Sequence, residues 1–323
     1  SIPFLGITGS NGKTTTKELV ARVLSRKFKV YSTKGNYNNH IGIPLTLLQV
    51  RRDIEFLVLE MGASAQKEID AYCKIAQPDF GLITNVGRAH LAGFGGEEGV
   101  RKGKGELYDY LMDHDGLVFV NSDEPFLDRM AKKLSRKVVY HSGQKVDTSQ
   151  FNLSVQCIRT EPSVLCKFSS ADNGEHILES SLIGRHNFMN IMSAIAVGNY
   201  FKVPGSQIKR AIELYRPSNN RSQIFQFEGV KYVKDAYNAN PDSMASMIES
   251  FASWSDEHKV LILGDMLEMG QLSATAHQEM VDLVEAKNCF ESIYLVGEHF
   301  YGTRSNSRIH KYLNVDELKK NWK

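Results

Sequence analysis

Residues 4–20 read "FLGITGSNGKTTTKELV". Residues 2–7 form a short apolar run rich in branched side chains, which predicts a buried strand, and residues 13–27 repeat apolar side chains at helical spacing. Gly9 and Gly12 therefore lie on a turn between a strand and a helix. Free N–H groups and the positive end of the helix dipole converge at such a turn, which suits a phosphate group.

The polar residues of this turn favour a nucleotide. Lys13 can place a positive charge against a phosphate, and Thr14 can offer a hydroxyl to Mg²⁺. The strict phosphate-loop pattern has another glycine where this chain has Ile7, so the spacing here is shorter. A glycine-rich turn with an exposed lysine is the alternative, but the combination of strand, lysine–threonine pair and helix favours ATP or GTP. The residues expected to bind the nucleotide here are Gly9, Ser10, Asn11, Gly12, Lys13, Thr14 and Thr15.

Composition limits the class of protein. The chain has 323 residues, and its 39 Lys and Arg against 37 Asp and Glu give a formal net charge of +2, so no basic field indicates nucleic acid. The four cysteines show no spacing typical of zinc or of a disulfide framework, which favours a reducing cytoplasm. No apolar run approaches the about 18 residues of a membrane span, and no leader precedes the first strand. Because the chain opens inside a core strand, we expect a fragment of a longer protein.

Residues 1–143 alternate apolar strands with amphipathic helices, which predicts a mostly parallel sheet covered on both faces. Besides residues 2–7, the expected strands are 54–60, 80–84, 117–120 and 138–141. The expected helices after the first are 67–75, 99–112 and 124–134.

Residues 151–182 change to short alternating runs, which predict antiparallel strands at the edge of the same domain. Helices are expected over 187–200 and 206–214. The polar segment "RPSNNRS", residues 216–222, predicts a linker, and "VKYVKDA", "KVLILGD" and "ESIYLVG" beyond it predict the strands of a second α/β unit. This division gives two domains, 1–217 and 218–323.

Two polar residues follow neighbouring strands of the first domain. Glu60 ends the apolar run "FLVLE", and His90 lies just after the strand that precedes "TNVGRAH". Ligands gather outside the carboxyl ends of strands in open α/β sheets, so we expect both side chains near the phosphate turn. A carboxylate there can hold Mg²⁺, with the histidine as a second metal ligand. An ordinary acid at a strand end and a structural histidine remain the alternatives.

The segment "GVRKGKGELYDYL" places Lys104 close to two other cations, Arg101 and Lys102, near the start of a helix. A solvated basic turn is the simple interpretation. A lysine held among cations is tolerable when it is neutral, or when carbon dioxide converts it to a carbamate that can bind a metal. The residues alone leave these alternatives open.

Polar residues near two later turns are further candidates. Asn187 and Asn190 share one face near a helix start, where the first can cap the helix and the second can bond a purine edge. Arg221 follows the linker and can reach a phosphate. Asp235 ends a strand and can hold ribose hydroxyls, although a helix-capping turn before Pro241 explains it equally well. Tyr237, Asn238 and Asn240 lie in the same turn.

Eight motifs together resemble a known family. In chain order they are "TGSNGKTTT", "GNYNNHIGIPLTLL", "EMGAS", "TNVGRAH", "KGKGE", "GRHNFMN", "DAYNANPDS" and "LGDMLEMG". This order is similar to that of the Mur ligases of cell-wall synthesis and spans nearly the whole chain. The second, seventh and eighth motifs look most like the type that adds D-alanyl-D-alanine to UDP-N-acetylmuramoyl-tripeptide. The short spacing of the phosphate turn is normal in this family.

The resemblance implies an ATP-dependent amide-bond ligase. A central ATPase domain would be followed by a Rossmann-like domain that closes over it, and the reaction would pass through an acyl phosphate. The implied enzyme would use two Mg²⁺ ions, be monomeric and cytoplasmic, and belong to peptidoglycan synthesis.

The family also implies a role for each matching residue. Lys13 and Gly12 would contact phosphates and Thr14 the first Mg²⁺, while Glu60 and His90 would hold the second, bridged by a carbamylated Lys104. Asn187 and Asn190 would lie near the base, Arg221 near the γ-phosphate and Asp235 near the ribose. The residues expected to face the peptide substrates are Asn36, Asn39, Tyr237 and Asn238.

Two departures from the family pattern bear on function. Nothing in the chain corresponds to the N-terminal domain that holds the UDP group, and the second domain stops at "LKKNWK" before the expected last strand and helix. His40 stands where some relatives have an acid. The alternatives are a sister ligase that adds one amino acid, a folylpolyglutamate-type ligase, and a catalytically silent nucleotide-dependent interaction module.

Overall fold

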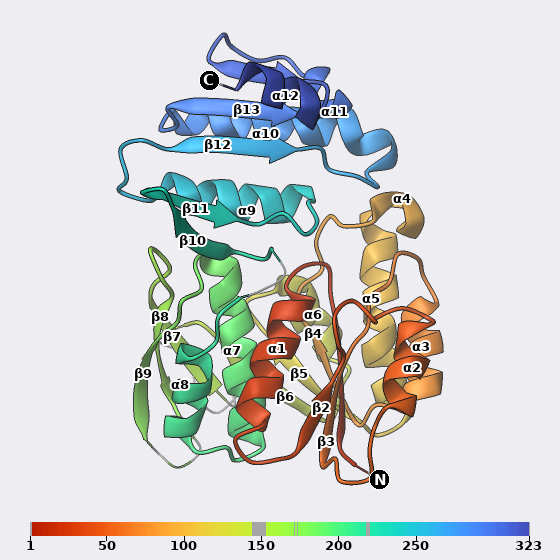
Figure 1. The fold of residues 1–323 in the computed structure, drawn as a ribbon. Helices are drawn as coiled ribbons and strands as arrows, with labels where there is room; N and C mark the ends of the chain where they lie inside the picture. Colours follow the sequence, from red (N-terminus) through yellow and green to blue (C-terminus); the bar gives the residue numbers. More distant parts are fainter. Residues whose placement is uncertain (1, 144–152, 171, 173, 218–219, 323) are drawn as a thin grey trace. The chain divides into compact units, whose positions relative to one another are not determined.

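The chain forms two compact units in the computed structural model, which describes residues 2–143, 153–170, 172, 174–217 and 220–322 (Figure 1). The first unit comprises Ser1–Gly87 and Phe94–Ser218, and the second comprises Arg88–Gly93 and Asn219–Lys323. Residues 218 and 219 of the predicted linker, and residues 151 and 152 of the predicted antiparallel region, lie outside the described residues. Segment 88–93, which the sequence places in the first domain, groups with the second unit.

A single large sheet organises the first unit. Within the described residues its strand order is β2-β3-β1-β4-β5-β6-β7-β8-β9, parallel from β2 to β7 and antiparallel from β7 to β9. The predicted mostly parallel sheet with an antiparallel edge is therefore confirmed. Its strands are β1 (Phe4–Thr8), β2 (Val30–Ser32), β3 (Phe56–Glu60), β4 (Phe80–Ile83), β5 (Leu117–Asn121), β6 (Lys137–His141), β7 (Leu153–Arg159), β8 (Leu165–Ser169) and β9 (Glu175–Glu179).

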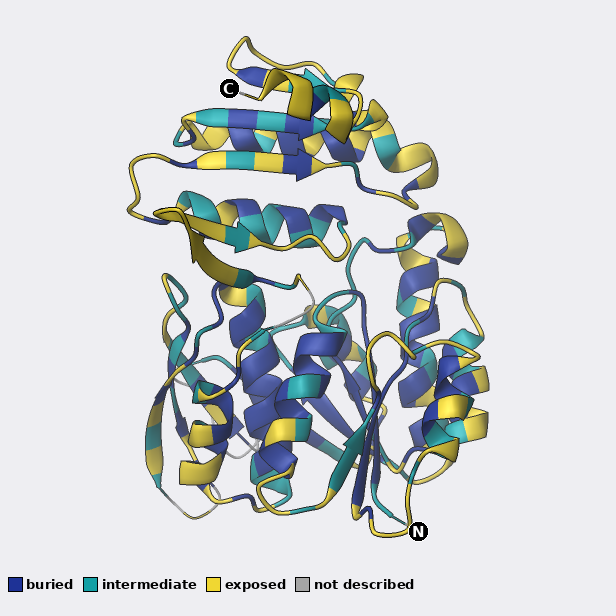
Figure 2. Cartoon of the chain, in the orientation of Figure 1, coloured by how far each residue is buried: buried dark blue, intermediate teal, exposed yellow. Residues whose placement is uncertain are grey.

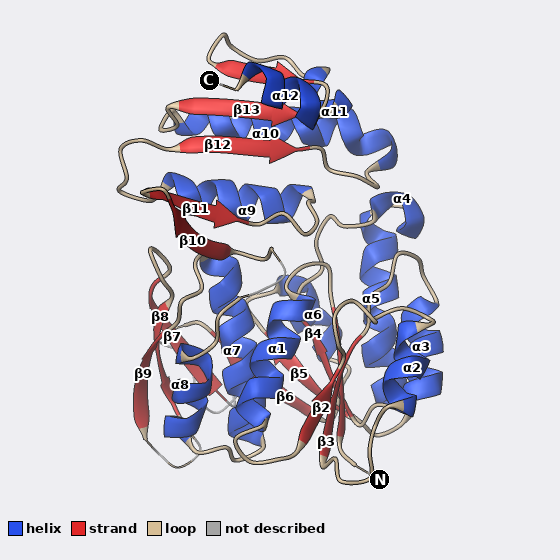
Figure 3. Ribbon diagram, in the orientation of Figure 1, coloured by secondary structure: helices blue, strands red, loops and turns tan. Residues whose placement is uncertain are grey.

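Helices cover the sheet as the alternation of elements requires (Figure 3). Helices α1, α7 and α8 pack together, α1 against β1 to β3 and α7 against β5 to β7, while α3 and α5 pair and α5 contacts β1, β4 and β5. The helices of this unit are α1 (Lys13–Leu24), α2 (Gly42–Leu48), α3 (Glu68–Ala76), α5 (Glu97–Asp113), α6 (Pro125–Ala131), α7 (Arg185–Tyr200) and α8 (Gly205–Glu213). The short α4 (Leu91–Phe94) begins in segment 88–93.

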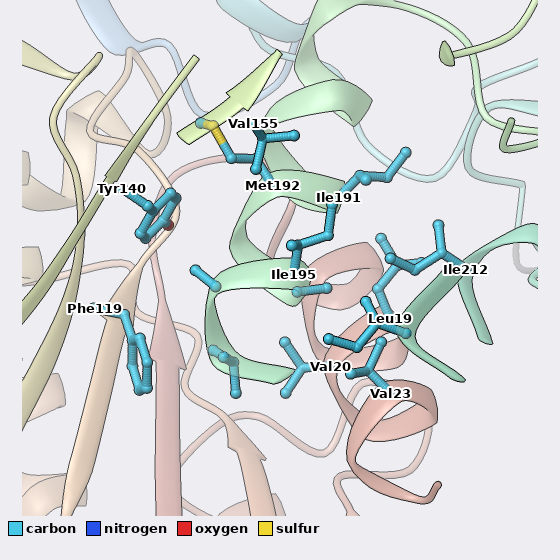
Figure 4. Close-up of a cluster of buried hydrophobic side chains, with 14 of the residues drawn as sticks. Leu19, Val20, Val23, Phe119, Tyr140, Val155, Ile191, Met192, Ile195 and Ile212 are labelled. Carbon is cyan, nitrogen blue, oxygen red and sulfur yellow. The ribbon is translucent and has the colours of Figure 1, made fainter. Parts of the chain in front are cut away.

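A hydrophobic core lies between the sheet and the packed helices α1, α7 and α8. Leu19, Val20 and Val23 of α1 face Ile191 and Ile195 of α7 (Figure 4). All five are fully buried, so each removes apolar surface from water at about 25 cal/mol per Å². The apolar side chains spaced along residues 13–27 therefore hold α1, and with it the turn before α1, against the sheet.

The register of the central strands positions that turn. Ile7 of β1 pairs with Glu60 of β3, and Thr8 pairs with Ile83 of β4, so the three parallel strands end at the same level. The phosphate turn leaves β1 at this edge. The end of β3 and the residues after β4 flank it, as expected for a ligand site in an open α/β sheet.

The second unit contains a three-stranded parallel sheet with helices and a separate hairpin. Within the described residues the sheet order is β12-β13-β14, and the hairpin pairs β10 with β11. The hairpin is largely exposed, whereas the strands of the first unit are mostly buried (Figure 2). Its elements are β10 (Gln223–Phe227), β11 (Val230–Lys234), α9 (Pro241–Ala252), β12 (Val260–Gly264), the 3-10 turn η1 (Gly270–Leu272), α10 (Ser273–Lys287), β13 (Ser292–Val296), α11 (Glu298–Tyr301), β14 (Ile309–Tyr312) and α12 (Val315–Asn321).

The sequence pattern missed several short elements. Strand β2 has three half-buried residues, and α2 carries a proline in its first turn, so neither has enough periodicity to be recognised. Strand β10 lies directly after the polar linker and is mostly exposed. The predicted first helix ends at Leu24 rather than at Lys27.

Candidate nucleotide and metal site

The phosphate turn has the backbone that its glycines predict. Gly12 has φ 78° and immediately precedes α1, and a Cβ there would lie 2.3 Å from Oδ1 of Asn190. Gly9 has φ 140°, and a Cβ there would lie 2.0 Å from Oγ1 of Thr84. Both positions combine a left-handed backbone with a close neighbour, so only glycine fits.

Residues after β4 hold the turn in place. The backbone N–H groups of Ser10 and Asn11 donate to the backbone oxygen and to Oδ1 of Asn85, each at 3.0 Å. Thr84 Oγ1 donates to the Asn11 carbonyl at 2.6 Å, and the Ser10 hydroxyl bonds the Gly87 backbone at 3.0 Å. The turn is thus preorganised by its neighbouring strand, which reduces the cost of ordering it around a ligand.

Lys13 lies over the turn. Its ammonium group donates to the carbonyl oxygens of Gly9 at 2.8 Å and Ser10 at 3.0 Å. The first N–H groups of α1, which have no acceptor within the helix, open at the same place. A negatively charged phosphate would meet both the ammonium group and these N–H groups.

Glu60 and Thr14 meet beside the turn. The Thr14 hydroxyl donates to Glu60 Oε1 at 3.1 Å, and Asn38 Nδ2 donates to the same oxygen at 2.8 Å. Glu60 is 1% exposed, and its Oε2 has no hydrogen-bond partner among the described residues. The Lys17 ammonium lies nearby, with its Nζ 3.8 Å from that oxygen.

This arrangement fits Mg²⁺. The described residues contain no group of three or more His, Cys, Asp or Glu side chains that could hold a metal. Magnesium seldom needs such a cage, because it keeps waters and binds through one or two carboxylates plus substrate phosphates. A buried carboxylate oxygen without a donor, next to a threonine hydroxyl and a phosphate turn, supplies that kind of partial shell.

Lys104 is fully buried in α5. Its Nζ donates to the Ala63 carbonyl at 3.0 Å and lies 4.9 Å from the centre of the Phe94 ring. Burial lowers the pKa of Lys104 well below its ordinary value, and the positive charge of Lys13 lowers it further. This lowering favours the uncharged amine, which is the form that carbamate formation requires. The cation that acts on Lys104 is Lys13, not the sequence neighbours Arg101 and Lys102. The carbamate itself stays a prediction.

Asn187 and Asn190 form a buried amide pair. Asn190 Nδ2 donates to Asn187 Oδ1 at 3.1 Å, Asn190 Oδ1 accepts from the Thr16 hydroxyl at 3.0 Å, and Asn187 Nδ2 donates to the Ile183 carbonyl at 2.8 Å. The helix cap is Gly184, so Asn187 is not the cap that the sequence suggested. The pair joins α7 to α1 behind Gly12, and its contact with a base stays a prediction.

His90 belongs to segment 88–93 of the second unit. Its Nδ1 contacts the carboxylate of Glu268, a residue of the motif "LGDMLEMG". Arg88 in the same segment donates from its backbone N–H and from Nε to the Asp242 carboxylate, at 2.6 and 3.0 Å, and from its guanidinium to Glu279 at 2.7 Å. Three motifs that lie far apart in the sequence are thus joined within the second unit.

Two other predicted residues are brought together in the second unit. The Arg221 guanidinium lies 3.7 Å from the centre of the Tyr237 ring, and its Nε is buried without a hydrogen-bond partner among the described residues. Asp235 accepts from the Ser222 backbone N–H at 3.0 Å, which fixes the chain just before β10. Asn238 is exposed, and its Oδ1 accepts from the next backbone N–H.

The loop before α2 carries the other predicted substrate residues. Asn36 is exposed. Asn39 is also exposed, and its Oδ1 accepts from the Gly42 backbone N–H at 2.9 Å, so it terminates the loop at the start of α2. Thr15 is buried and faces away from solvent at the first turn of α1.

Sequence reasoning missed several residues that shape the site. They share positions beside predicted ones: Asn38 between two predicted asparagines, Lys17 in the helix after the turn, and Thr84 and Asn85 in the quoted "TNVGRAH". An excess of polar residues directly after β4 was the available signal. No sequence signal indicated that Glu268 contacts His90, because only the tertiary structure joins the two residues.

Comparison with known proteins identifies the family. The sequence profile of the Mur ligase middle domain matches residues 7–198, and that of the Mur ligase glutamate ligase domain matches residues 220–321. The chain belongs to the Mur ligase family. The resemblance seen in the eight motifs is confirmed.

Two similar proteins of this family bear the name of the same type of Mur ligase. The chain is 36% identical over 277 residues to the UDP-N-acetylmuramoyl-tripeptide–D-alanyl-D-alanine ligase of Bacillus subtilis, covering 85% of this chain and 58% of that protein. It is 32% identical over 303 residues to the ligase of the same name from Treponema pallidum, covering 92% and 62%. The chain thus spans less than two thirds of the length of these two relatives.

Solved Mur ligase structures have the same fold. MurF from Acinetobacter baumannii matches with a TM-score of 0.87 at 27% identity, over 99% of this chain and 69% of that one. MurF from Thermotoga maritima, solved in complex with ADP, matches with a TM-score of 0.84 at 26% identity, over 99% and 72%. The predicted P-loop domain followed by a Rossmann-like domain is confirmed by these matches.

Proposed function

We propose that this chain carries the ATP-binding and ligating part of an enzyme that joins D-alanyl-D-alanine to UDP-N-acetylmuramoyl-tripeptide during peptidoglycan precursor synthesis. The names of its relatives support this assignment, and the ADP complex of the Thermotoga maritima enzyme supports the nucleotide. The observation that carries it is the preorganised phosphate turn with Lys13 above it and Thr14 bonded to Glu60.

The proposed reaction has two steps. The terminal carboxylate of the tripeptide attacks the γ-phosphorus of ATP, and the bond from that phosphorus to the β-phosphate oxygen breaks. ADP departs, and the tripeptide becomes an acyl phosphate. The amine of D-alanyl-D-alanine, after losing a proton, attacks the acyl carbon and inorganic phosphate departs. Charge on the transferred phosphoryl group must be stabilised in the first step, so cations and positioning dominate catalysis.

The residues of the first unit divide this work. Lys13 and the N–H groups at the start of α1 bind the phosphates, and Asn85 and Thr84 keep the turn in the binding conformation. Thr14 and Glu60 hold Mg²⁺, which when bound neutralises phosphate charge. The buried amine of Lys104, as a carbamate, with Glu60 and His90 supplies the proposed second cation site.

The second unit contributes the remaining contacts. Arg221, held against Tyr237, binds the γ-phosphate, and Asp235 binds the ribose. Asn187 and Asn190 support the base side from the first unit. Asn36, Asn39, Tyr237 and Asn238 face the peptide substrates. We further propose that the enzyme is cytoplasmic, where ATP is available, and that it is monomeric, as the family resemblance implies.

The product assay tests the function directly. The full-length protein is incubated with ATP, MgCl₂ and UDP-N-acetylmuramoyl-tripeptide, and ADP release is measured with D-alanyl-D-alanine, single amino acids or no amine. Release with the dipeptide, accompanied by the amide product in mass spectrometry, is expected. Release with one amino acid but not the dipeptide would indicate a sister ligase, and no product with any amine would indicate a nucleotide-dependent interaction module.

Lys13→Ala tests the phosphate site. We expect turnover to fall about 10²- to 10³-fold, because a charge contact to the transferred phosphoryl group is lost. Lys29→Ala, which removes an exposed lysine after the same helix, is the matched control. Steady-state ADP release measures both variants. Wild-type turnover in Lys13→Ala would refute the site.

Lys104→Ala tests the carbamate. The variant should lose turnover and regain part of it when short carboxylates such as acetate are added, because a free carboxylate can replace the missing carbamate. Full activity without Lys104, or a loss that no short carboxylate restores, would contradict the carbamate.

A further inference from the structure

A buried positive charge lies beside Glu60 that the proposed reaction does not use. Lys17 follows Thr14 by one turn of α1, and its side chain is 3% exposed. Its Nζ donates to the Thr33 carbonyl at 2.9 Å, and the Thr33 hydroxyl accepts from the Glu60 backbone N–H at 2.9 Å. Lys17 therefore ties the phosphate helix to the ends of β2 and β3.

The Lys17 ammonium lies between two carboxylates. Its Nζ is 3.8 Å from Glu60 Oε2 and 3.9 Å from Glu18 Oε1. The Glu60 side chain is 2% exposed and that of Glu18 is 25% exposed, so the two partners differ mainly in their access to water. Glu18 is fixed where it is, since the Tyr215 hydroxyl donates to its Oε2 at 2.6 Å.

At these distances the Lys17 ammonium and the two carboxylates affect one another electrostatically. A buried carboxylate is costly unless a cation lies close by, and Lys17 supplies that cation to Glu60. Oε2, the oxygen that Lys17 faces, is also the Glu60 oxygen without a hydrogen-bond donor among the described residues. A divalent ion arriving at this oxygen would repel the ammonium, and Glu18 offers it a second carboxylate at almost the same distance.

We propose that Lys17 is the resident counter-ion of Glu60, and that its ammonium shifts to Glu18 when the magnesium–nucleotide complex binds. Lys17 is thus a positioning residue that keeps Glu60 in place before the cation arrives. The proposal rests on the proposed function, because it takes Glu60 as a magnesium ligand.

Two variants should change magnesium binding in opposite directions. In Lys17→Met the competing cation is gone, so the MgCl₂ concentration for half-saturation at a fixed ADP concentration should fall at least about threefold. In Glu18→Gln the displaced ammonium has no second carboxylate, so the same concentration should rise by at least about threefold. A purely structural role for these residues would not produce opposite signs.

The measurement is calorimetric titration of MgCl₂ into the full-length protein with saturating ADP, together with titration of ADP in the absence of metal. Metal-free ADP affinity should change less than about twofold in both variants, because neither residue contacts the phosphate turn. Lys132→Met, in which an exposed lysine at the end of α6 is replaced, is the matched control and should leave all values unchanged.

A second readout needs no nucleotide. Metal-free unfolding temperatures of Lys17→Met, Glu60→Gln and the double variant form a cycle that should be non-additive, because either single change already breaks the Lys17–Glu60 pair. Additive shifts would overturn the pairing. Magnesium shifts of the same sign in Lys17→Met and Glu18→Gln, or none beside a normal wild-type response, would overturn the exchange. A wild-type protein with no magnesium response would instead refute the magnesium site of the proposed function, and the exchange with it.

Discussion

The side chain of Lys104 is fully buried, unlike those of the two cations that precede it in the same helix. In the sequence it lies in a basic run beside Arg101 and Lys102, which are half-buried and exposed. In the structure it is buried against Phe94 and Ala63, and burial together with Lys13 lowers the pKa of its amine. One helix thus carries an exposed charge at Lys102 and a buried amine at Lys104.

Replacing Lys104 should stabilise the fold while removing function. The unfolded chain binds a proton on Lys104 up to pH about 10.4, whereas the folded protein releases it at a lower pH. Wild-type stability therefore rises with pH across that window, and Lys104→Met lacks this dependence. The variant should melt above the wild type at pH 7, by a margin that shrinks toward pH 10.

Thermal unfolding in carbonate-free buffer from pH 7 to 10 measures this margin. Lys102→Met, on the exposed face of the same helix, is the control and should show no such trend. A margin that stays constant with pH would contradict the lowered pKa of the buried Lys104 amine.

The turn between β1 and α1 is held by elements on both sides. The segment after β4 contributes Thr84 and Asn85, and α7 contributes Asn190 behind Gly12. The glycines are required because these neighbours leave no room for a Cβ. Binding geometry at the turn is thus a property of packing as much as of the local motif.

Gly12→Ala should destabilise the first unit and abolish nucleotide binding. Its Cβ would meet Asn190 at 2.3 Å on a backbone with φ 78°, which we expect to cost about 2–4 kcal/mol of unfolding free energy. Gly35→Ala is the matched control, since its φ is 53° but no atom lies within 4 Å of the added Cβ. It should cost only about 1 kcal/mol. Denaturant unfolding of both variants checks the difference, and equal losses would show that packing against α7 is unimportant.

Helix α9 begins with a reciprocal capping arrangement. Asn240 Oδ1 accepts from the Ser243 backbone N–H at 3.0 Å, and the Ser243 hydroxyl accepts from the Asn240 backbone N–H at 3.1 Å. Asn240→Ala should therefore lower the unfolding free energy of the second unit by about 0.5–2 kcal/mol. Urea unfolding followed by Trp254 fluorescence measures this loss, and Asn321→Ala near the chain end should have a smaller effect. An unchanged midpoint would contradict the cap.

The residues proposed to serve the nucleotide and metal site come from both units. Lys13, Thr14, Glu60 and Lys104 belong to the first, whereas His90, Arg221 and Asp235 belong to the second. The proposed reaction therefore draws on both units of one chain.

None of the helices in the described part of the chain is both apolar and long enough to span a bilayer.

Hydrogen exchange should locate the nucleotide on this division. Adding ADP and Mg²⁺ should protect amides of residues 9–16 and 84–87, because the phosphate turn and the strand end that holds it become less mobile. An ATP analogue with the tripeptide should extend protection to residues 221–240 if Arg221 and Asp235 take their proposed roles. The Lys13→Ala protein is the control. Protection confined to the second unit would contradict the assignment of the phosphate site.

Long periodic elements were predictable, and short ones were not. Most strands and helices from β1 to α8 matched the structure within a few residues, because the central strands are continuous buried apolar runs and the longer helices carry apolar side chains at helical spacing. Strand β2, helix α2 and strand β14 have three, seven and four residues, too few to show a period. Their formation depends on neighbours that are distant in the sequence.

Residues that are close together in the chain suffice to predict the phosphate turn, the alternation of strands and helices, and the motifs that mark the family. The burial of Lys104, the position of Lys17 between Glu60 and Glu18, and the contact between Glu268 and His90 follow only from the folded chain. Burial and charge pairing depend on which strands and helices pack together, and that information lies in contacts between residues far apart in the sequence.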